Sequence, residues 1–505
     1  MVSDLPVYIP LLPPLAGAVI LTATSSLYRR RHYGVARWLI SILSLLASLL
    51  LLILLLPSMP SSWQLGAYGP PAGSCLRLDP LSAFLCLTAV SVTSLSVAFS
   101  YRYMEHDRGK NRYYSLMLLL TAGLLGVFVS GDLFTLFVFW ELMCVSSYAL
   151  VAFRKHEWEP LEAGFKYLVM STVGSLVALY GISLVYGIAG TLEISGIGTA
   201  LSGAGMTGYF PLAMIVAGFG VTAAIVPFHT WLPDAHPAAP SPVSAVLSGL
   251  VIKGGAYAIF RVLFTGFASF SFGVPLMVLG AITMTLGNLM VFAQQDIKRF
   301  FAFSSVANMG LILLAGGAAA QIAEAHPAAA GLACIAMAGA LFHILNHALG
   351  KSLLFLSSGS MIHSAGTRSI QSLEGIARRM PWSGGALTVG LLSLAGVPPL
   401  GGFWSKLMVL APLAALLASG DPAIATAFAV VLVNSLLAAG YYIWLAQRIA
   451  FKPTAVPDTV GEPPASMLIP VLILSLICIG MAFALPWLIP AFEAISRSLV
   501  GGVIR

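Results

Sequence analysis

Six side chains that can gain or lose a proton lie within apolar segments of this sequence. They are Glu141, Lys253, His343, His347, Lys351 and Lys406. Ionisable groups inside a membrane are costly and commonly mark ion or proton pathways. Histidine titrates near neutral pH, and a lysine removed from water gives up its proton more easily. Together these groups predict a chain of proton carriers bridged by water.

Glu141 is the only carboxylate of the six. Its segment, residues 132–153, contains no other charge except Asp132 at the first position. At 1.5 Å per residue, Glu141 is expected roughly 13–14 Å from that end, near the middle of a ~30 Å hydrocarbon core. We therefore expect Glu141 to be a functional carboxylate, with Asp132 as a further contributor.

Three of the six residues share one helix face. His343, His347 and Lys351 follow one another at intervals of four residues. This spacing aligns them along about 12 Å of one helix. Lys351 lies near the expected end of its helix and is therefore a contributor of second rank.

Each of these residues also has a structural explanation. Glu141 could pair with a lysine, and the histidines could donate hydrogen bonds between helices. Lys253 could bind a backbone carbonyl, and Lys406 could neutralise the carbonyl ends of a broken helix. Six such groups would make an expensive scaffold in a membrane, so the functional explanation is favoured.

The elements that must position these residues are membrane helices. Hydrophobic residues make up 59% of the 505 residues and charged residues 9%, with a mean hydropathy of +0.94. A soluble domain has about 25% charged residues. Fourteen apolar runs are long enough to cross a bilayer, near 5–26, 35–56, 79–101, 113–129, 132–153, 162–186, 209–229, 240–263, 273–293, 299–316, 329–351, 385–417, 421–449 and 466–489. The sequence predicts an all-α polytopic membrane protein.

Two of the runs are interrupted by proline or glycine. They are helix 7, at Ile225–Phe228, and helix 12, at Val397–Gly402. Breaks five helices apart predict two inverted five-helix repeats, helices 4–8 and 9–13. The expected domains are 1–112 for helices 1–3, 113–263 for the first repeat, 273–449 for the second repeat and 466–489 for helix 14.

Positive charges predict the orientation of the chain. Most of the 25 lysines and arginines fall in alternate loops, among them Arg29, Arg30 and Arg31, and few fall in the others, among them Arg261 and Arg505. Cytoplasmic loops are enriched in these residues. We expect both termini on the outer side of a prokaryotic plasma membrane. Residues 5–26 lack a basic n-region and a cleavage site, so they are expected to form the first membrane helix.

Other chemistries find no support in the sequence. The five cysteines are far apart and form no CxxC pair or Cys/His cluster, and no glycine-rich phosphate loop is present. Disulfide frameworks, zinc sites and iron–sulfur clusters need such spacings. The expectation is a chain without cofactor, metal, catalytic redox site or nucleic-acid partner.

Five segments carry a resemblance to a known family. They are FVFWELMCVSSYAL (137–150), VPFHTWLPDAHPAAPSPVSAVLSGLVIKGGAYAIFR (226–261), QQDIKRFFAFSSVANMG (294–310), HILNHALGKSLLFLSSG (343–359) and SLAGVPPLGGFWSK (393–406). In this order they resemble the antiporter-like subunits shared by respiratory complex I, Mrp-type cation/proton antiporters and group 4 membrane-bound hydrogenases. The resemblance covers roughly residues 75–450.

The resemblance implies a lateral chain of protonatable groups through the fourteen helices. By motif, Glu141 matches the helix-5 glutamate, Lys253 the central helix-8 lysine and Lys406 the helix-12 residue near the exit. His343 and His347 match the polar helix-11 positions between them.

One position departs from the family pattern. The family usually has a lysine five residues before the proline of PFHTWLP, and this lysine pairs with the helix-5 glutamate. Here the position is Thr222. His229 or Lys253 could take its place, or this half of the path could be partly degenerate.

We therefore expect a proton-translocating subunit, with Na⁺ coupling open, of a multisubunit membrane-bound redox complex of the hydrogenase or complex I type. Its expected partners are other membrane subunits, including antiporter-like neighbours, and a peripheral iron–sulfur redox module. Two alternatives remain at this point. One is a subunit of an Mrp-type antiporter without a redox partner, and the other is a membrane subunit that conducts nothing.

Overall fold

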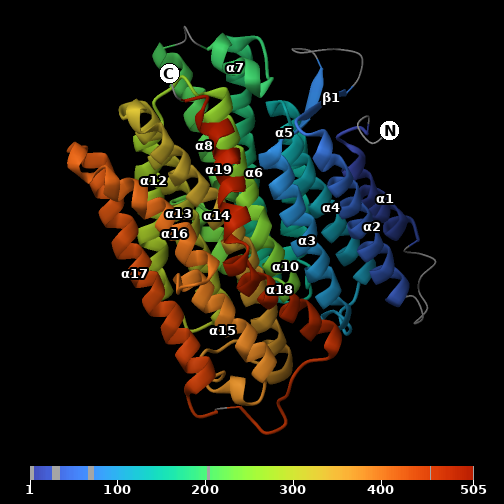
Figure 1. Ribbon diagram of the computed structural model, residues 1–505. Helices are drawn as coiled ribbons and strands as arrows, with labels where there is room; N and C mark the ends of the chain where they lie inside the picture. The colour runs from blue at the N-terminus through green and yellow to red at the C-terminus, as the bar shows by residue number, and fades with distance from the viewer. Residues whose placement is uncertain (1–4, 25–33, 66–72, 202–204, 455, 504–505) are drawn as a thin grey trace. The chain divides into compact units, whose positions relative to one another are not determined.

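A computed structural model describes residues 5–24, 34–65, 73–201, 205–454 and 456–503 (Figure 1). Arg29, Arg30, Arg31 and Arg505, used for the orientation, lie outside the described residues. Within this described part, 13 helices are long and apolar enough to cross a membrane, and a shorter apolar helix spans Ile9–Ala23. The prediction of an all-α multi-pass membrane protein is confirmed.

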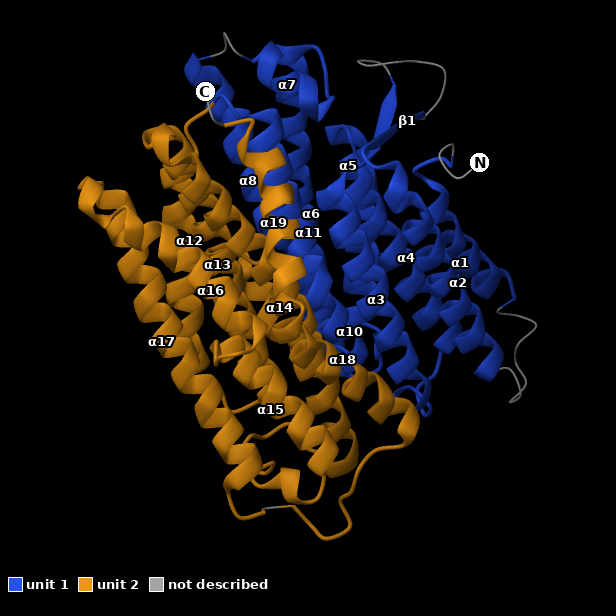
Figure 2. Ribbon diagram, in the orientation of Figure 1, with its two compact units in different colours: residues 1–223, 238–269 blue, residues 224–237, 270–505 orange. Residues whose placement is uncertain are grey.

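The described chain forms two compact units (Figure 2). Unit 1 comprises residues 1–223 and 238–269, and unit 2 comprises residues 224–237 and 270–505. The elements of unit 1 are α1 (Leu12–Ala23), α2 (Gly34–Leu55), β1 (Ser61–Leu65), β2 (Ser74–Leu78), α3 (Pro80–Tyr103), α4 (Lys110–Val129), α5 (Leu133–Val151), α6 (Trp158–Ala189), α7 (Ile194–Ala200), α8 (Tyr209–Thr222), α10 (Ser241–Val246), the π-helix η7 (Leu247–Val251) and α11 (Ile252–Arg261).

Unit 2 begins at the break that follows α8. Its helices are α9 (Leu232–Ala238, whose last residue belongs to unit 1), α12 (Gly273–Val291), α13 (Ile297–Ala325), α14 (Ala330–Ala365), α15 (Pro381–Ala395), α16 (Gly401–Ala415), α17 (Pro422–Phe451), α18 (Ala465–Phe483) and α19 (Leu485–Val500). Within this unit, α17 packs along α12 and α15, and α14 packs along α13 and α16. The division of the chain into inverted repeats stays a prediction.

Aspartates start several of the described helices. Asp79, Asp132, Asp296 and Asp421 are the N-caps of α3, α5, α13 and α17, and each side chain accepts a hydrogen bond from a backbone N–H of the first turn. A carboxylate satisfies these otherwise unpaired donors and complements the positive end of the helix dipole. Acidic residues at these ends therefore set where the membrane helices begin.

Glycines let α12 and α13 approach each other closely. A Cβ added at Gly287 would lie 2.5 Å from the backbone nitrogen of Ala307, and one at Gly317 would lie 2.6 Å from that of Met277. Small residues at helix contacts are the usual way to pack helices in a membrane. The two helices thus form a tightly packed pair within unit 2.

Three details differ from the sequence prediction. The helix expected at 329–351 continues to Ala365, and the hydroxyls of Ser352 and Ser357 in this extension are satisfied by carbonyls of the same helix. The helix expected at 466–489 is two helices, α18 and α19, since a proline near the start of α19 interrupts the donor pattern. The hairpin of β1 and β2 was not anticipated.

Candidate functional site

The predicted break in helix 7 is confirmed. The helix α8 ends at Thr222, and Ala224 adopts a φ of 55° before helical structure resumes at Phe228. A residue other than glycine with positive φ is strained and persists only where the surrounding structure holds it. In unit 1, Gly255 of α11 packs against the end of α8, where an added Cβ would lie 2.6 Å from the nitrogen of Ala223.

The predicted break in helix 12 is also confirmed. The helix α15 ends at Ala395, Gly396 has a φ of +87°, and α16 starts at Gly401. Lys406 Nζ donates to the carbonyls of Leu394 and Ala395 at 2.9 and 3.0 Å. Lys406 therefore meets the carbonyl ends of the broken helix, as one of the structural explanations predicted.

Glu141 lies on α5 in unit 1. It is half-buried, and its Oε1 atom is buried without a hydrogen bond to any described residue. Its neighbour Trp140 is buried against Phe219 of α8, with 4.5 Å between the ring centroids. The carboxylate thus lies on the helix that packs against the end of the broken helix 7.

Thr222 faces the helix of Glu141. Its Oγ1 lies 3.8 Å from Sγ of Cys144, which is one helical turn from Glu141 on α5. The position that carries the usual family lysine is therefore turned toward α5, but it supplies a hydroxyl and no charge.

Lys253 is the second residue after the π-helix η7. It is 1% exposed, and its Nζ donates to the carbonyl of Ser248 inside that π-helix. A π-helical turn shifts the backbone pairing by one residue and is frequent at functional sites. The irregular turn gives the buried ammonium of Lys253 an acceptor within its own helix.

His343 is the centre of the polar groups in unit 2. Its imidazole is fully buried, with Nδ1 at 2.9 Å from Oγ of Ser405 and Nε2 at 2.9 Å from Oδ1 of Asn308. The ring of His347 lies 6.2 Å away, centroid to centroid, at an interplanar angle of 27°. The predicted common face of the two histidines is confirmed.

Lys351 extends this face of α14 and is fully buried in the middle of the helix. Its Nζ donates to Oγ of Ser304 and to the carbonyl of Phe301, the latter at 3.0 Å. Asn308 Nδ2 donates to the carbonyl of Ser304 at 2.6 Å and to the hydroxyl of Tyr442 at 3.1 Å. Lys351 and His343 therefore belong to one cluster of polar contacts, which also includes Ser405. Ser405 is the sequence neighbour of Lys406.

Several residues of this cluster were missed by the sequence reasoning. Asn308, Ser304 and Ser405 are buried within apolar helices, and that placement was the available signal. His236 of α9 was also missed: it is fully buried, and its ring stacks on Phe355 of α14 at 4.5 Å. A polar residue in an apolar run indicates a buried hydrogen-bond partner, because burying such a residue without a partner costs free energy.

The remaining candidates have different surroundings. Asp132 accepts hydrogen bonds from the backbone N–H and the hydroxyl of Thr135, both at 2.7 Å, and from the N–H of Cys75 at 2.9 Å. It is therefore engaged as a helix cap. His229 is half-buried in unit 2, with its ring 6.5 Å from that of Phe303. Among the described residues, no group of three or more His, Cys, Asp or Glu could hold a metal ion.

Comparisons with known proteins place the chain in a family. A family model described as "NADH:quinone oxidoreductase/Mrp antiporter, TM" matches residues 130–433, and one for the N-terminus of complex I chain 5 matches residues 73–114. The chain is 32% identical to NADH-quinone oxidoreductase subunit N of Desulforudis audaxviator, over 85% of this chain and 88% of that protein. It is also 32% identical to hydrogenase-4 component B of Escherichia coli, over 85% of this chain but only 66% of that longer protein.

A solved structure has the same fold. A chain of the membrane-bound sulfane sulfur reductase, an archaeal respiratory membrane complex, superimposes with a TM-score of 0.83 and 27% identity, covering 98% of this chain and 99% of that one. The likeness thus extends over the N-terminal and C-terminal helices that the family models leave out.

Proposed function

Because the chain belongs to the family of transmembrane subunits of NADH:quinone oxidoreductases and Mrp antiporters, we propose that it is an antiporter-like subunit that translocates protons within a multisubunit redox complex. The relatives named as a hydrogenase component and as a quinone oxidoreductase subunit support this class of complex. We infer other membrane subunits and a peripheral iron–sulfur module as partners, in the plasma membrane of a prokaryote.

The observation that carries the proposal is the buried polar run of unit 2. Lys351 donates to the hydroxyl of Ser304, whose backbone carbonyl accepts from Asn308. Asn308 in turn bonds one ring nitrogen of His343, and Ser405 bonds the other. A merely structural tie between helices needs one such bond. A cluster that brings two titratable groups together with hydroxyls and an amide provides the polar surroundings that a hydrated proton path requires, with water as the proposed link between them.

In the proposed mechanism the titratable groups change protonation in turn. Glu141 and Lys253 act in unit 1, and His343, His347 and Lys406 act in unit 2. Moving one charge across the membrane requires about 2.3 kcal/mol per 100 mV. The chain holds no redox centre of its own in this proposal, so the neighbouring module must supply this free energy.

The test is proton transport by the intact complex in sealed vesicles. Glu141→Gln and Lys253→Ala each remove a titratable group, and we expect both to lower the number of protons moved per catalytic turnover. Lys155→Ala is the matched control, because Lys155 is exposed in the loop after α5. Full pumping by both variants would show that the residue assignment is wrong.

The second candidate is a subunit of an Mrp-type antiporter that works without a redox partner, and the family model covers both classes. What copurifies with the chain separates the two. Iron–sulfur subunits support the redox complex, whereas small membrane subunits alone support the antiporter. The same purification, followed by transport assays with and without Na⁺, identifies the ion.

A further inference from the structure

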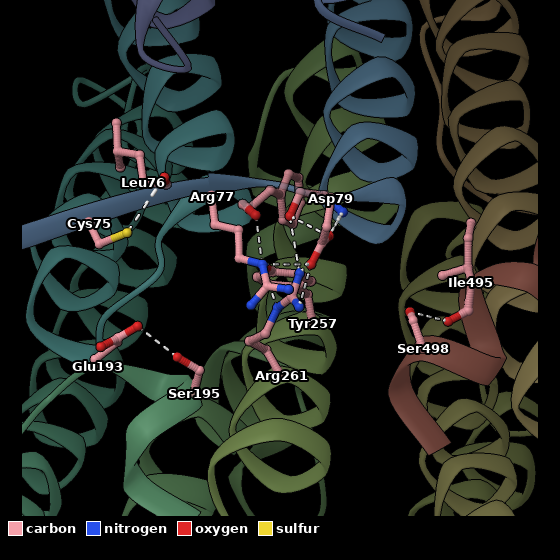
Figure 3. Close-up of polar contacts among 12 residues, drawn as sticks. Cys75, Leu76, Arg77, Asp79, Glu193, Ser195, Tyr257, Arg261, Ile495 and Ser498 are labelled. Atoms are coloured by element: carbon pink, nitrogen blue, oxygen red, sulfur yellow. Dashed lines mark hydrogen bonds and ion pairs between the residues drawn. The ribbon is translucent and has the colours of Figure 1, made fainter. Parts of the chain in front are cut away.

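A buried ion pair lies at the end of unit 1 that carries the β-hairpin. Arg261, expected in a loop from the charge pattern, is the last residue of α11 and is 7% exposed. Its guanidinium contacts both carboxylate oxygens of Asp79, at 2.7 and 2.8 Å (Figure 3). Although burial opposes ionisation, the Arg261 charge holds the pKa of Asp79 below its usual range, so the pair is charged at neutral pH.

The pair is aligned with the central lysine of unit 1. Lys253, Tyr257 and Arg261 follow one another at intervals of four residues, which spans about 12 Å of one helix face. Tyr257 is 1% exposed, donates its hydroxyl to the carbonyl of Phe128 at 2.6 Å and accepts from Arg261 Nε at 3.1 Å. A polar line therefore leads from Lys253 to the ion pair.

A polar cavity of about 340 Å³ adjoins Arg261. Its lining includes side chains of Ser61, Gln64, Cys75, Arg77, Glu193 and Arg261. At ~30 Å³ per molecule this volume holds roughly ten waters, and a lining of charged and polar groups supplies their hydrogen-bond partners. Arg77 also approaches the ion pair, with its Nε 3.9 Å from a carboxylate oxygen of Asp79.

We propose that this cavity is an aqueous vestibule for the unit 1 proton path and that the Arg261–Asp79 pair is its gate. The inference rests on the proposed function and adds an access route to it. In the closed arrangement the guanidinium of Arg261 donates a hydrogen bond to the hydroxyl of Tyr257 and separates that hydroxyl from the cavity. Glu193 lines the same cavity and offers the guanidinium a second carboxylate. When Arg261 moves toward it, the Tyr257 hydroxyl passes a proton to cavity water and takes one from water beside Lys253.

The thiol of Cys75 makes the access of water to the vestibule measurable. Cys75 lines the cavity and is half-buried, whereas Cys86, Cys144 and Cys478 are buried. Cys334 is also half-buried, so the assay uses a Cys334→Ser background. Burial and the charges of Glu193 and Asp132 raise the pKa of the Cys75 thiol, so all variants are labelled at one alkaline pH.

The experiment labels the intact complex in vesicles with a cationic, membrane-impermeant methanethiosulfonate. Cys75 lies on the cavity side of the gate, so its labelling in the parent tests whether the cavity is open to water. Asp79→Asn removes one charge of the gate, and we expect the proton leak through the unlabelled complex without turnover to rise about tenfold, the effect of losing one charge-assisted hydrogen bond. Arg261→Lys keeps the charge with fewer donors and should give a smaller rise. This second variant keeps the test valid if the first one misfolds.

Proton flux gives the second readout. A cationic group attached to Cys75 should lower the proton flux at least by half. Labelling with the small, neutral methyl methanethiosulfonate should preserve most of the proton flux. Labelling of Cys334 alone, in a Cys75→Ser background, should have no effect on flux. Absence of Cys75 labelling in the parent, an unchanged proton leak in both gate variants, or full flux after complete cationic labelling would overturn the vestibule.

Glu141→Gln separates this inference from the proposed function. If that variant stops proton flux while labelled Cys75 does not, the vestibule is wrong and the proposed function stands. If neither change lowers the flux, the proposed function fails as well. Loss of flux in both, with a faster proton leak in the gate variants, supports the vestibule.

Discussion

Lys406 combines two roles that two substitutions can separate. The residue is 6% exposed, and its ammonium donates to the carbonyls of Leu394 and Ala395. The proposed function also makes it a proton carrier. Lys406→Met keeps the length of the side chain but removes the charge and both hydrogen bonds. Lys406→Arg keeps a charge and several donors, but an arginine does not release its proton in a protein.

The magnitudes follow from the two carbonyls. A buried polar group that loses its hydrogen bond costs about 1–3 kcal/mol, so the methionine variant should lose about 2–6 kcal/mol of the free energy of unfolding. The arginine variant should lose less, since its guanidinium can reach the same carbonyls. It must fit beside Gly396, where an added Cβ would already lie 3.3 Å from Cδ of Lys406. Both variants should lose proton transport.

The assay measures the Tm of the purified complex and proton uptake per turnover in vesicles. Lys452→Met is the matched control, because Lys452 is exposed after α17 and such substitutions change stability by no more than about 0.5 kcal/mol. A methionine variant at position 406 as stable as the parent would refute the capping role. Full transport by the arginine variant would refute the proton-carrying role.

Gly255→Ala should destabilise the protein by about 1–3 kcal/mol, as overpacking does, because the new Cβ meets the backbone of Ala223 at 2.6 Å; Gly254→Ala meets only a flexible methionine tip and should cost less in the same thermal unfolding assay. Thr222→Lys restores the amine of the family pattern opposite α5, so we expect a higher proton flux, and an unchanged flux would mean that unit 1 needs no charge there. Asp421 is partly buried, which opposes ionisation, but hydrogen bonds at the start of α17 hold its pKa below the usual value. The ionised Asp421 therefore contributes to the free energy of unfolding at pH values above its pKa in the unfolded chain, and this contribution is lost as the pH falls through its pKa in the folded protein. The Tm difference between the parent and Asp421→Asn should shrink on acidification.

The membrane helices could be predicted because the bilayer imposes a simple rule on composition. A helix must offer about twenty apolar residues to the hydrocarbon, and every run of that kind in this chain is visible without a structure. The breaks in helices 7 and 12 were equally visible, since proline and glycine interrupt the backbone pattern at Pro227 and Pro398. Helix ends were harder to predict: α14 continues well beyond Lys351 through a serine-rich stretch that did not read as an apolar run.

The charged members of the candidate site were visible for the same reason, because a charge in an apolar run is costly and stands out in the sequence. Their partners were not. Asn308 and Ser405 are ordinary residues in the sequence and become significant only because α13 and α16 bring them to the two nitrogens of His343. Likewise the sequence predicted Arg261 to be a charge in a loop. In the structure it is the last residue of α11 and contacts Asp79, which precedes it by more than 180 residues.

The sequence by itself determined the membrane class, the breaks and the identity of the buried charges, since these depend on local composition and on the cost of a charge in hydrocarbon. The tertiary structure decided which group each charge meets. Lys253 meets the irregular turn of its own helix, Lys406 the carbonyl ends of α15, and Lys351 the hydroxyl of Ser304. Such pairings depend on how distant helices pack and rotate against one another, and hydrogen bonds a few ångströms long leave no trace in the spacing of residues along the chain.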